Sequence, residues 1–431
     1  MKYDKALGAL WGLLVGDCLG SPIQFTDKDG HPHVTEMLPC KHFGTPPGHW
    51  TDDGSMALCV AESVGRLGRF DRADVGRNFV RWLRDGFLSS MPSAFDVGGA
   101  TWRSVSAIEA KGSMENGTED SQGNGSVMRL APSWIAARAC GKPEILRECS
   151  DLTHRSRRVR QTVERMAGIL DELAAKGATA AVSAYATRED CNNSGWCVST
   201  LECALWALNT TSTFEDALVA AVNLGGDADT IGAVCGQLAG AKYGFSAIPE
   251  RWLAAIKDRG KIAAIFDRFL AALGIPGRDG YPRPALAADI VAIRPAVHDG
   301  RGDGEILLVR RGGEPFKGAF ALPGGFLQPG ESLEECARRE LKEETGLDAE
   351  TLMALPPRSA PGRDPRGWVV SCPFLCVVAP DAGGDVRGGD DAAEAAWVPL
   401  GAVPSPLAFD HGEILADALV RLRPKSARGG G

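Results

Sequence analysis

The first 275 residues place their apolar side chains at the spacing of helices that pack into a core. Alanine, leucine and glycine dominate this part, and the helical period is clearest at residues 55–64, 160–176 and 230–243. Few alternating stretches of the kind that forms strands compete with it. The pattern therefore predicts a mostly helical domain over residues 1–275.

The apolar run at residues 6–15 follows two lysines, as the apolar part of a secretion signal does. Asp4 stands beside those lysines, three glycines interrupt the run, and Asp17 ends it. We therefore expect the first helix of a core. No apolar run reaches the roughly 18 residues that span a bilayer, so we expect no membrane partner and a cytoplasmic protein.

Beyond residue 288 the pattern changes to short β-branched runs bounded by glycine, proline and aspartate, as at 289–293, 306–309 and 369–378. One strong helix, over 332–344, lies among them. A proline- and glycine-rich segment separates the helical part of the sequence from the part with short strands. We expect a helical domain over 1–275, a linker over 276–288, a domain of strands and helix over 289–424, and a disordered tail over 425–431.

The composition is that of an ordinary globular protein. The 431 residues include 47 Lys and Arg against 55 Asp and Glu, a formal net charge of −8. This balance lacks the basic excess of proteins that coat nucleic acids, so we do not expect nucleic acid as a partner. The basic run at 154–160 is expected to be a solvated helix face. The 12 cysteines include no CxxC pair and predict free thiols in a reducing compartment.

The helix at 332–344 carries the first chemical signal. Ser332 and Glu335 have the spacing of a capping box, which fixes the start of the helix. Glu340, Glu343 and Glu344 share one face because they stand at i, i+3 and i+4. Such a face is either a solvated acidic surface or a site for a hard cation such as Mg²⁺.

The wider spacing favours the cation site. Gly325, Glu331, the triplet 339–341, the pair 343–344 and the pair 346–347 occupy every fixed position of the Nudix box. This part of the chain resembles the Nudix hydrolases, which split nucleoside diphosphates linked to another moiety. The resemblance implies an α/β domain, an α-β-α sandwich, with Mg²⁺ or Mn²⁺ held by catalytic residues and one carbonyl. These are Glu340, Glu343, Glu344 and the carbonyl of Gly324.

Further features of this domain follow from the resemblance. It implies a structural ion pair between Glu331 and Arg339. Segments 310–318 and 362–367 are similar to those of members that act on ADP-ribose or sense it. An additional catalytic carboxylate is expected before the last strand, with Asp390, Asp391 and Glu394 as candidates.

The helical domain holds two acidic clusters of like composition. Thr51, Asp52 and Asp53 precede a helix that we expect to start near Ser55, and residues 227–230 precede another. Asp and Thr at helix starts are commonly N-caps, which is one interpretation of both clusters. The other is a shared binuclear Mg²⁺ site, because carboxylates and hydroxyls are the ligands this ion prefers.

Five motifs in order favour the metal site: residues 16–20, 50–53, 123–129, 153–154 and 225–230. Together they resemble the ADP-ribosylglycohydrolase family, the group that includes the dinitrogen-reductase-activating glycohydrolases. The resemblance implies an all-α domain that hydrolyses the bond between C1″ of ADP-ribose and an acceptor. It implies two Mg²⁺ ions bound by Thr51, Asp52, Asp53, Asp227, Asp229 and Thr230, with the four aspartates catalytic.

The resemblance also implies a substrate-binding set. Gly123, Asn124, Gly125 and Ser126 would form a loop of small residues that approaches the phosphates. His154 would contact the ADP-ribose. One position departs from some relatives: Gln24 stands where they carry a glutamate, and an amide cannot act as a general base. The acceptor, arginine, serine or another group, is therefore left open.

The two resemblances together predict a bifunctional, metal-dependent hydrolase. The first domain would release ADP-ribose from an ADP-ribosylated protein or other acceptor, and the second would cleave that ADP-ribose to AMP and ribose 5-phosphate. One alternative gives the Nudix domain another nucleotide as substrate. Another makes it a non-catalytic sensor of ADP-ribose.

Overall fold

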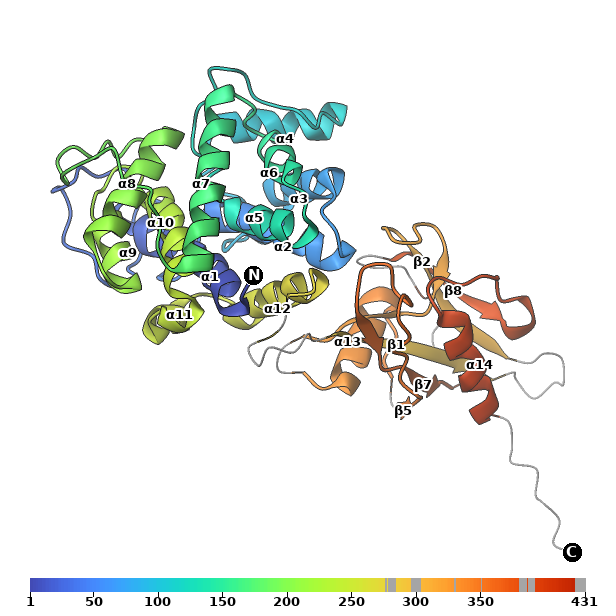
Figure 1. Ribbon diagram of the computed structural model, residues 1–431. Helices are drawn as coiled ribbons and strands as arrows, with labels where there is room; N and C mark the ends of the chain where they lie inside the picture. The colour runs from blue at the N-terminus through green and yellow to red at the C-terminus, as the bar shows by residue number, and fades with distance from the viewer. Residues whose placement is uncertain are drawn as a thin grey trace, which may run out of the picture. The chain divides into compact units, whose positions relative to one another are not determined.

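The computed structural model describes residues 1–275, 277, 284–295, 304–328, 331–349, 351–379, 386 and 392–422 (Figure 1). The chain forms two compact units, Met1–Pro282 and Arg283–Gly431. The predicted tail lies outside the described residues. Part of the predicted linker does so too, whereas its last residues already belong to a strand that begins at Ala285.

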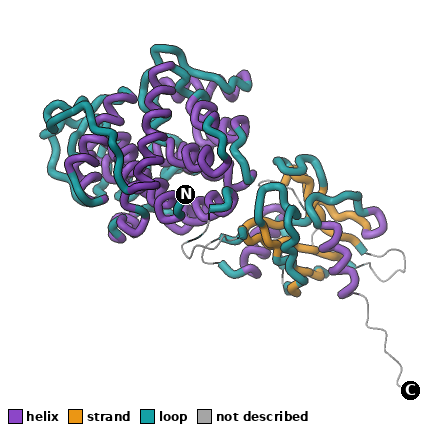
Figure 2. Tube along the Cα trace, in the orientation of Figure 1, coloured by secondary structure: helices purple, strands orange, loops and turns teal. Residues whose placement is uncertain are grey.

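The described part of the first unit is built of helices joined by loops (Figure 2). They are α1 (Tyr3–Gly20), α2 (Asp52–Leu67), α3 (Arg72–Asp85), α4 (Gly99–Lys111), α5 (Leu130–Cys140), α6 (Glu144–Ser150), α7 (Arg157–Lys176), α8 (Cys197–Thr210), α9 (Phe214–Val222), α10 (Ala228–Tyr243), α11 (Glu250–Ala255) and α12 (Arg259–Ala272). Short 3₁₀ turns follow α1 at Ser21–Ile23 and α10 at Phe245–Ala247. The all-α expectation for this domain is confirmed.

Helices α1 and α10 run antiparallel and touch along a row of glycines. Gly8 faces Gly240, Gly12 faces Gly236, and Gly16 faces Gly232. A Cβ atom built on any of these glycines would lie against the carbonyl of its partner, so only glycine permits this approach. The contact places the C-terminal end of α1, which carries Asp17, beside the N-terminal end of α10. We call this row the glycine seam.

Helix α1 is the core helix that the sequence predicts. By length and composition alone, the segment Tyr3–Ile23 would be apolar enough to cross a membrane. Almost all of it is buried inside the first unit, which is the environment of a core helix. All 12 cysteines are free thiols, and only Cys140 and Cys372 are not buried.

The second unit is built on a mixed sheet. Its strands are β1 (Ala285–Arg294), β2 (Glu305–Arg311), β3 (Phe320–Ala321), β4 (Gly324–Phe326), β5 (Met353–Ala354), β6 (Val369–Ser371), β7 (Phe374–Val377) and β8 (Ala392–Pro399). The order β3-β2-β1-β7-β5 forms the main path, while β4 and β6 pair with β1 and β8 pairs with β2. β1 runs parallel to β7 and antiparallel to β2 and β4.

Strand β1 separates two apolar layers. Ile290 and Ala292 pack with Ala337 and Leu341 of α13 (Leu333–Thr345). Side chains of the opposite parity, such as Val291, pack with α14 (His411–Leu422) on the other face. The α-β-α sandwich is therefore present. The expectation of a single strong helix in this domain is wrong, since α14 covers the second face.

Candidate functional sites

The two acidic clusters of the first unit meet at one cavity. Asp52 and Asp53 open α2, and Asp227 and Asp229 flank the start of α10. All four line a cavity of about 490 Å³. The Thr230 hydroxyl donates to Asp53 Oδ1 at 3.4 Å, across 177 positions of sequence. The fold therefore brings five of the six predicted metal ligands to one cavity, whereas Thr51 does not line it.

Local structure explains the position of the first cluster. Thr51 is the N-cap of α2, and its hydroxyl accepts a hydrogen bond from Asp53 N. The helix begins at Asp52, three residues earlier than expected. Asp17, at the end of α1, accepts from Thr51 N at 3.0 Å and Gly54 N at 2.9 Å. Thr51 and Asp17 are completely buried, so the two helices hold this turn between them.

The second cluster is not held by capping. Asp227 occupies the N-cap position of α10, but its side chain makes no capping bond. Asp227 Oδ2 instead accepts a hydrogen bond from Asn124 Nδ2. Gly226, just before it, has a φ of 63°, a conformation that favours glycine. The N-cap interpretation therefore applies to Thr51 and does not apply to Asp227.

Asp96 is a further carboxylate of this cavity, and it lies outside the motifs of the sequence. It lines the cavity, lies beside the side chains of Gln24 and Asp229, and has a φ of 57°. A left-handed aspartate is uncommon and often marks a functional turn. The signal that could have found it is an aspartate just before the glycine pair Gly98 and Gly99.

The carboxylates repel one another and lie away from water. Burial, followed by the neighbouring carboxylates, raises the pKa of Asp52, Asp53 and Asp229 well above the usual range. Burial also raises the pKa of Asp227 to about 6 and that of Asp17 to about 7. Such a group of acids is stable only when protons or cations neutralise part of its charge.

One buried cation lies close to these acids. Arg129 is 1% exposed, donates to Thr153 Oγ1 at 2.6 Å and to the Gly125 carbonyl, and partly opposes the rise that burial causes in the pKa of Asp52. Its guanidinium is also 5.0 Å from the Phe79 ring centroid. Arg129 therefore joins the 123–129 loop to the 153–154 turn, and it offsets a single negative charge.

The negative charge of the aspartates that Arg129 does not offset is suited to binding divalent cations. Three carboxylate oxygens, Asp53 Oδ2, Asp96 Oδ2 and Asp229 Oδ1, are buried without a hydrogen-bond partner. Within the described part of the chain, no three His, Cys, Asp or Glu side chains already stand in the arrangement of a metal centre. Mg²⁺ keeps several waters and needs only one or two carboxylates, so the pairs at α2 and α10 suit it.

The predicted substrate loop lies on one side of the cavity. Gly123, Asn124, Gly125 and His154 all line it, whereas Ser126 does not. The Ser126 hydroxyl is buried and accepts a hydrogen bond from Ser150. Burial, with Arg129 nearby, lowers the pKa of His154 to about 3, so this imidazole is neutral. Its Cε1 atom would lie 2.6 Å from a Cβ at Gly125, which explains the glycine.

The candidate site of the second unit lies on a single helix, α13. Ser332 and Glu335 form the predicted capping box. Arg339 Nη1 donates to Glu340 Oε1 at 2.6 Å and to Glu343 Oε2 at 3.2 Å, and Arg339 also pairs with Glu331. Burial raises the pKa of Glu340, while Arg339 opposes that change. The arginine thus holds two of the three glutamates of this face, Glu340 and Glu343, together and offsets part of their charge.

Strand β4 completes this second site. Gly324 N donates to Glu344 Oε2 at 3.1 Å, so the predicted carbonyl and carboxylate ligands lie next to each other. A Cβ on Gly325 would collide with the Glu340 carboxylate, which accounts for the glycine. Glu394, on β8, pairs with Arg310 at 3.0 Å, and Asp390 and Asp391 lie outside the described residues.

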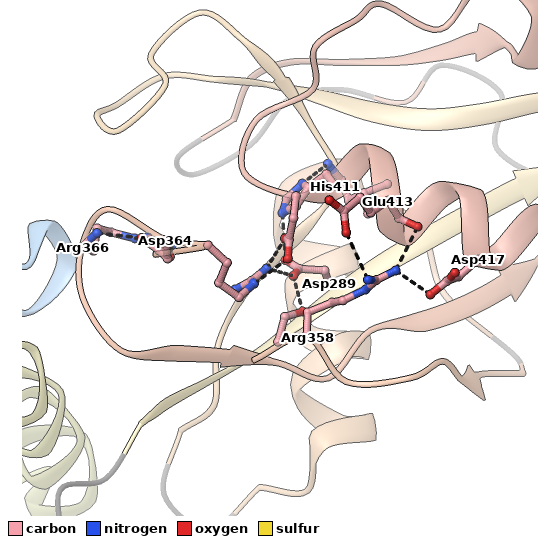
Figure 3. A network of polar contacts seen from close by, with 11 residues as sticks. Asp289, Arg358, Asp364, Arg366, His411, Glu413 and Asp417 are labelled. Atoms are coloured by element: carbon pink, nitrogen blue, oxygen red, sulfur yellow. Dashed lines mark hydrogen bonds and ion pairs between the residues drawn. The ribbon is translucent and has the colours of Figure 1, made fainter. Parts of the chain in front are cut away.

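A buried polar network lies behind this strand (Figure 3). Asp289, on β1, is paired with Gly324 and lies 3.6 Å from His411 Nε2. His411 Nδ1 accepts from Leu322 N at 2.9 Å, so the neutral tautomer with a proton on Nε2 fits both contacts. Arg363 lies 3.8 Å from Asp289 and pairs with Asp410 at 2.6 Å. The hydrogen bond from Leu322 N to His411 ties the 322–325 turn to the start of α14.

Comparison with known proteins decides the family. The family model described as ADP-ribosylglycohydrolase matches residues 1–278, well over half of the chain. The chain belongs to the ADP-ribosylglycohydrolase family. A second family model, the NUDIX domain, matches residues 289–418. This ADP-ribosylglycohydrolase therefore carries a second hydrolase domain of another family.

Individual relatives agree with both assignments. The glycohydrolase part is 36% identical over 275 residues to the ADP-ribosylarginine hydrolase Tri1 of Pseudomonas putida, covering 58% of this chain and 73% of that protein. The Nudix part is 45% identical over 137 residues to the ADP-ribose pyrophosphatase of Methanocaldococcus jannaschii, covering 32% of this chain and 74% of that enzyme. A solved ADP-ribosylglycohydrolase-related protein complex aligns with a TM-score of 0.53 and 36% identity, over 63% of this chain and 96% of that one.

Proposed function

We propose that this ADP-ribosylglycohydrolase removes ADP-ribose from arginine side chains and that its Nudix domain cleaves the released ADP-ribose to AMP and ribose 5-phosphate. The observation that carries the first half is one cavity in which two distant aspartate pairs leave buried oxygens without partners. The capping box, the three glutamates and Gly324 support the second half. Arginine is chosen because the similar protein from Pseudomonas putida is an ADP-ribosylarginine hydrolase.

In the glycohydrolase domain, Thr51, Asp52, Asp53, Asp227, Asp229 and Thr230 would hold two Mg²⁺ ions. Bound there, the ions would supply the positive charge that orients the ribose hydroxyls and a water. Asp96 is our candidate for the group that takes the proton of that water. Its carboxylate faces the cavity and leaves one oxygen without a partner. Gln24, which lies beside it, cannot accept a proton.

Substrate would be oriented by the opposite side of the same cavity. The small residues Gly123 and Gly125 let the pyrophosphate approach the backbone closely. The neutral His154 offers a hydrogen bond without attracting a proton from the acids. Positive charge develops on the ribose as the glycosidic bond breaks, and the surrounding carboxylates stabilise it.

In the Nudix domain, Glu340, Glu343, Glu344 and the Gly324 carbonyl would hold Mg²⁺ or Mn²⁺. The metal would neutralise the pyrophosphate and lower the pKa of the attacking water. Arg339 keeps Glu340 and Glu343 in place. The product of the first reaction contains the pyrophosphate that the second cleaves, which is our reason for linking the two activities.

The expectations about cellular location and about nucleic acid stay proposals. A cytoplasmic location is supported by the free thiols, which persist in reducing compartments. The absence of nucleic acid among the partners stays a prediction.

The test uses two substrates with the full chain. With Mg²⁺ present, we expect arginine from ADP-ribosylarginine and AMP from free ADP-ribose, and both should stop when EDTA removes the metal. Failure to release arginine would reject the first half of the proposal. Binding of free ADP-ribose without AMP formation would replace the second half with the sensor alternative.

A further inference from the structure

Four aromatic side chains stand together at the mouth of the carboxylate cavity. We call Phe25, His42, Phe43 and Phe95 the aromatic wall. Their rings meet edge to face, with centroids 5.0 Å apart for Phe25 and His42, 4.6 Å for His42 and Phe43, and 5.2 Å for Phe43 and Phe95. The first three line the cavity directly, and Phe95 precedes Asp96. The wall and the acid therefore form adjoining surfaces.

Phe25 is held at the mouth of the cavity in a backbone conformation that is unfavourable for its side chain. The residue is 61% exposed and has a φ of 63°, which is rare for a bulky side chain. Two backbone bonds fix it: Phe25 N donates to the Gly226 carbonyl, and Gly226 N donates to the Thr26 carbonyl, each at 2.6 Å. An exposed ring locked to the loop that carries Asp227 is better suited to contact a ligand than to pack in a core.

The contacts join the lining residues into two groups. Asp96 lies beside Gln24 and Asp229 and close to His42 of the wall. In the second group, Asn124 bonds Asp227, and the His154 ring lies against Gly125. The small-residue loop suits phosphates, so the ADP-ribose part belongs there. The aromatic wall is then available to bind the acceptor, the group that the scissile bond joins to ADP-ribose.

The chemistry of the wall selects a planar cation. A guanidinium stacks on aromatic faces and pairs with carboxylates, and it is less strongly hydrated than an ammonium ion. A neutral base would gain only the stacking, and a phosphate would gain nothing from the aromatic faces and would be repelled by the neighbouring Asp96. We propose that the aromatic wall, together with Asp96, forms the subsite that binds the guanidinium of the arginine acceptor. This inference rests on the proposed function.

The test uses the full chain with Glu344→Gln as reference, so that the second domain leaves the substrate and product intact. Phe25→Leu keeps apolar bulk and removes the aromatic face, whereas Phe25→Trp restores a face. Phe316→Leu is the matched control, because Phe316 is also exposed, at 42%, with a φ of 61°. Release of agmatine from ADP-ribosylagmatine measures KM and kcat, and free ADP-ribose serves as competitive inhibitor.

We expect Phe25→Leu to raise KM for ADP-ribosylagmatine about tenfold and Phe25→Trp to restore it within about threefold. Inhibition by free ADP-ribose, which lacks the guanidinium, should change less than about twofold in either variant. Phe316→Leu should match the reference. Unchanged KM in Phe25→Leu, or an equal loss of ADP-ribose inhibition, would overturn the subsite. If the reference chain itself releases no agmatine, the arginine acceptor is wrong and the guanidinium subsite with it.

Discussion

The two candidate sites solve the same electrostatic problem in different ways. In the Nudix domain, three glutamates lie on one helix, and Arg339 offsets their charge within the protein. In the glycohydrolase domain, five aspartates from three separate parts of the chain line a cavity. Asp17 is buried against the turn that carries two of them, and Arg129 is a buried cation beside the group. Both sites would hold metal ions, but in the first an arginine already contacts two of the acids directly. The second leaves buried carboxylate oxygens without partners and depends on distant segments meeting.

The largest expected effects separate the two sites from each other. Asp53→Asn should lower arginine release by about 10³-fold, because a metal centre that loses a ligand gives up several kcal/mol of transition-state stabilisation. Glu344→Gln should lower AMP formation from free ADP-ribose by a similar factor. Each variant should leave the other activity unchanged, as measured by chromatography of arginine and AMP. A parallel loss of both activities in either variant would mean that the sites are not independent.

The second prediction concerns how distant segments reach the glycohydrolase site. Gly12→Ala would force apart the glycine seam, and we expect the free energy of unfolding to fall by about 3 kcal/mol. Gly168→Ala is the control, since a Cβ there has nothing within 4 Å, and it should stabilise by up to about 1 kcal/mol. Chemical denaturation followed by tryptophan fluorescence measures both. Equal stability of the two variants would show that the seam is not tightly packed.

The third prediction concerns the internal charge compensation on α13. Arg339→Ala leaves Glu331 and Glu340 without their partner, and should cost about 2 kcal/mol of unfolding free energy in the Nudix domain. Lys342 lies on the same helix as Arg339, and Lys342→Ala, which breaks its exposed pair with Asp348, should cost less than about 0.5 kcal/mol. Hydrogen exchange of α13 amides reports this domain specifically. Similar protection in both variants would count against the role given to Arg339.

The smallest effect is expected from the network behind β4. His411→Ala removes the acceptor of Leu322 N and the contact with Asp289, so the 322–325 turn loses its support. Loss of such an outer contact should lower kcat for AMP formation about tenfold, with little change in KM. Glu413→Ala, a neighbour on the exposed side of α14, should retain full activity. A kcat for His411→Ala equal to that of Glu413→Ala would leave the network without a role in positioning the turn.

The difference between the sites also explains what the sequence could predict. The Nudix face is local: its capping box and its i, i+3, i+4 glutamates follow from helix geometry alone, and the structure contains both. The pairing of the 51–53 and 227–230 clusters depended on a family resemblance, because no local rule joins residues so far apart. Asp17 and Arg129 lie within the 16–20 and 123–129 motifs, but only the fold shows that they stand beside the carboxylates, and Asp96 lies outside every motif.

Two features that the sequence analysis does not predict are helix α14 and the glycine seam between α1 and α10. Helix α14 has an amphipathic pattern about as clear as that of α13, so its signal was present in the sequence, and its contact with β1 and β2 shows which face of the sheet it covers. In the sequence, the glycines of α1 stand as interruptions of an apolar run. Their spacing of four residues, repeated in α10 at 232, 236 and 240, was the signal of a close helix contact.

The most direct test of a two-step enzyme is a time course on ADP-ribosylarginine with the unaltered chain and Mg²⁺. The account predicts that arginine and AMP appear in equal final amounts, with free ADP-ribose rising first and then falling. Release of AMP while ribose phosphate is still attached to arginine, or arginine accompanied by ADP-ribose that is never cleaved, would contradict it.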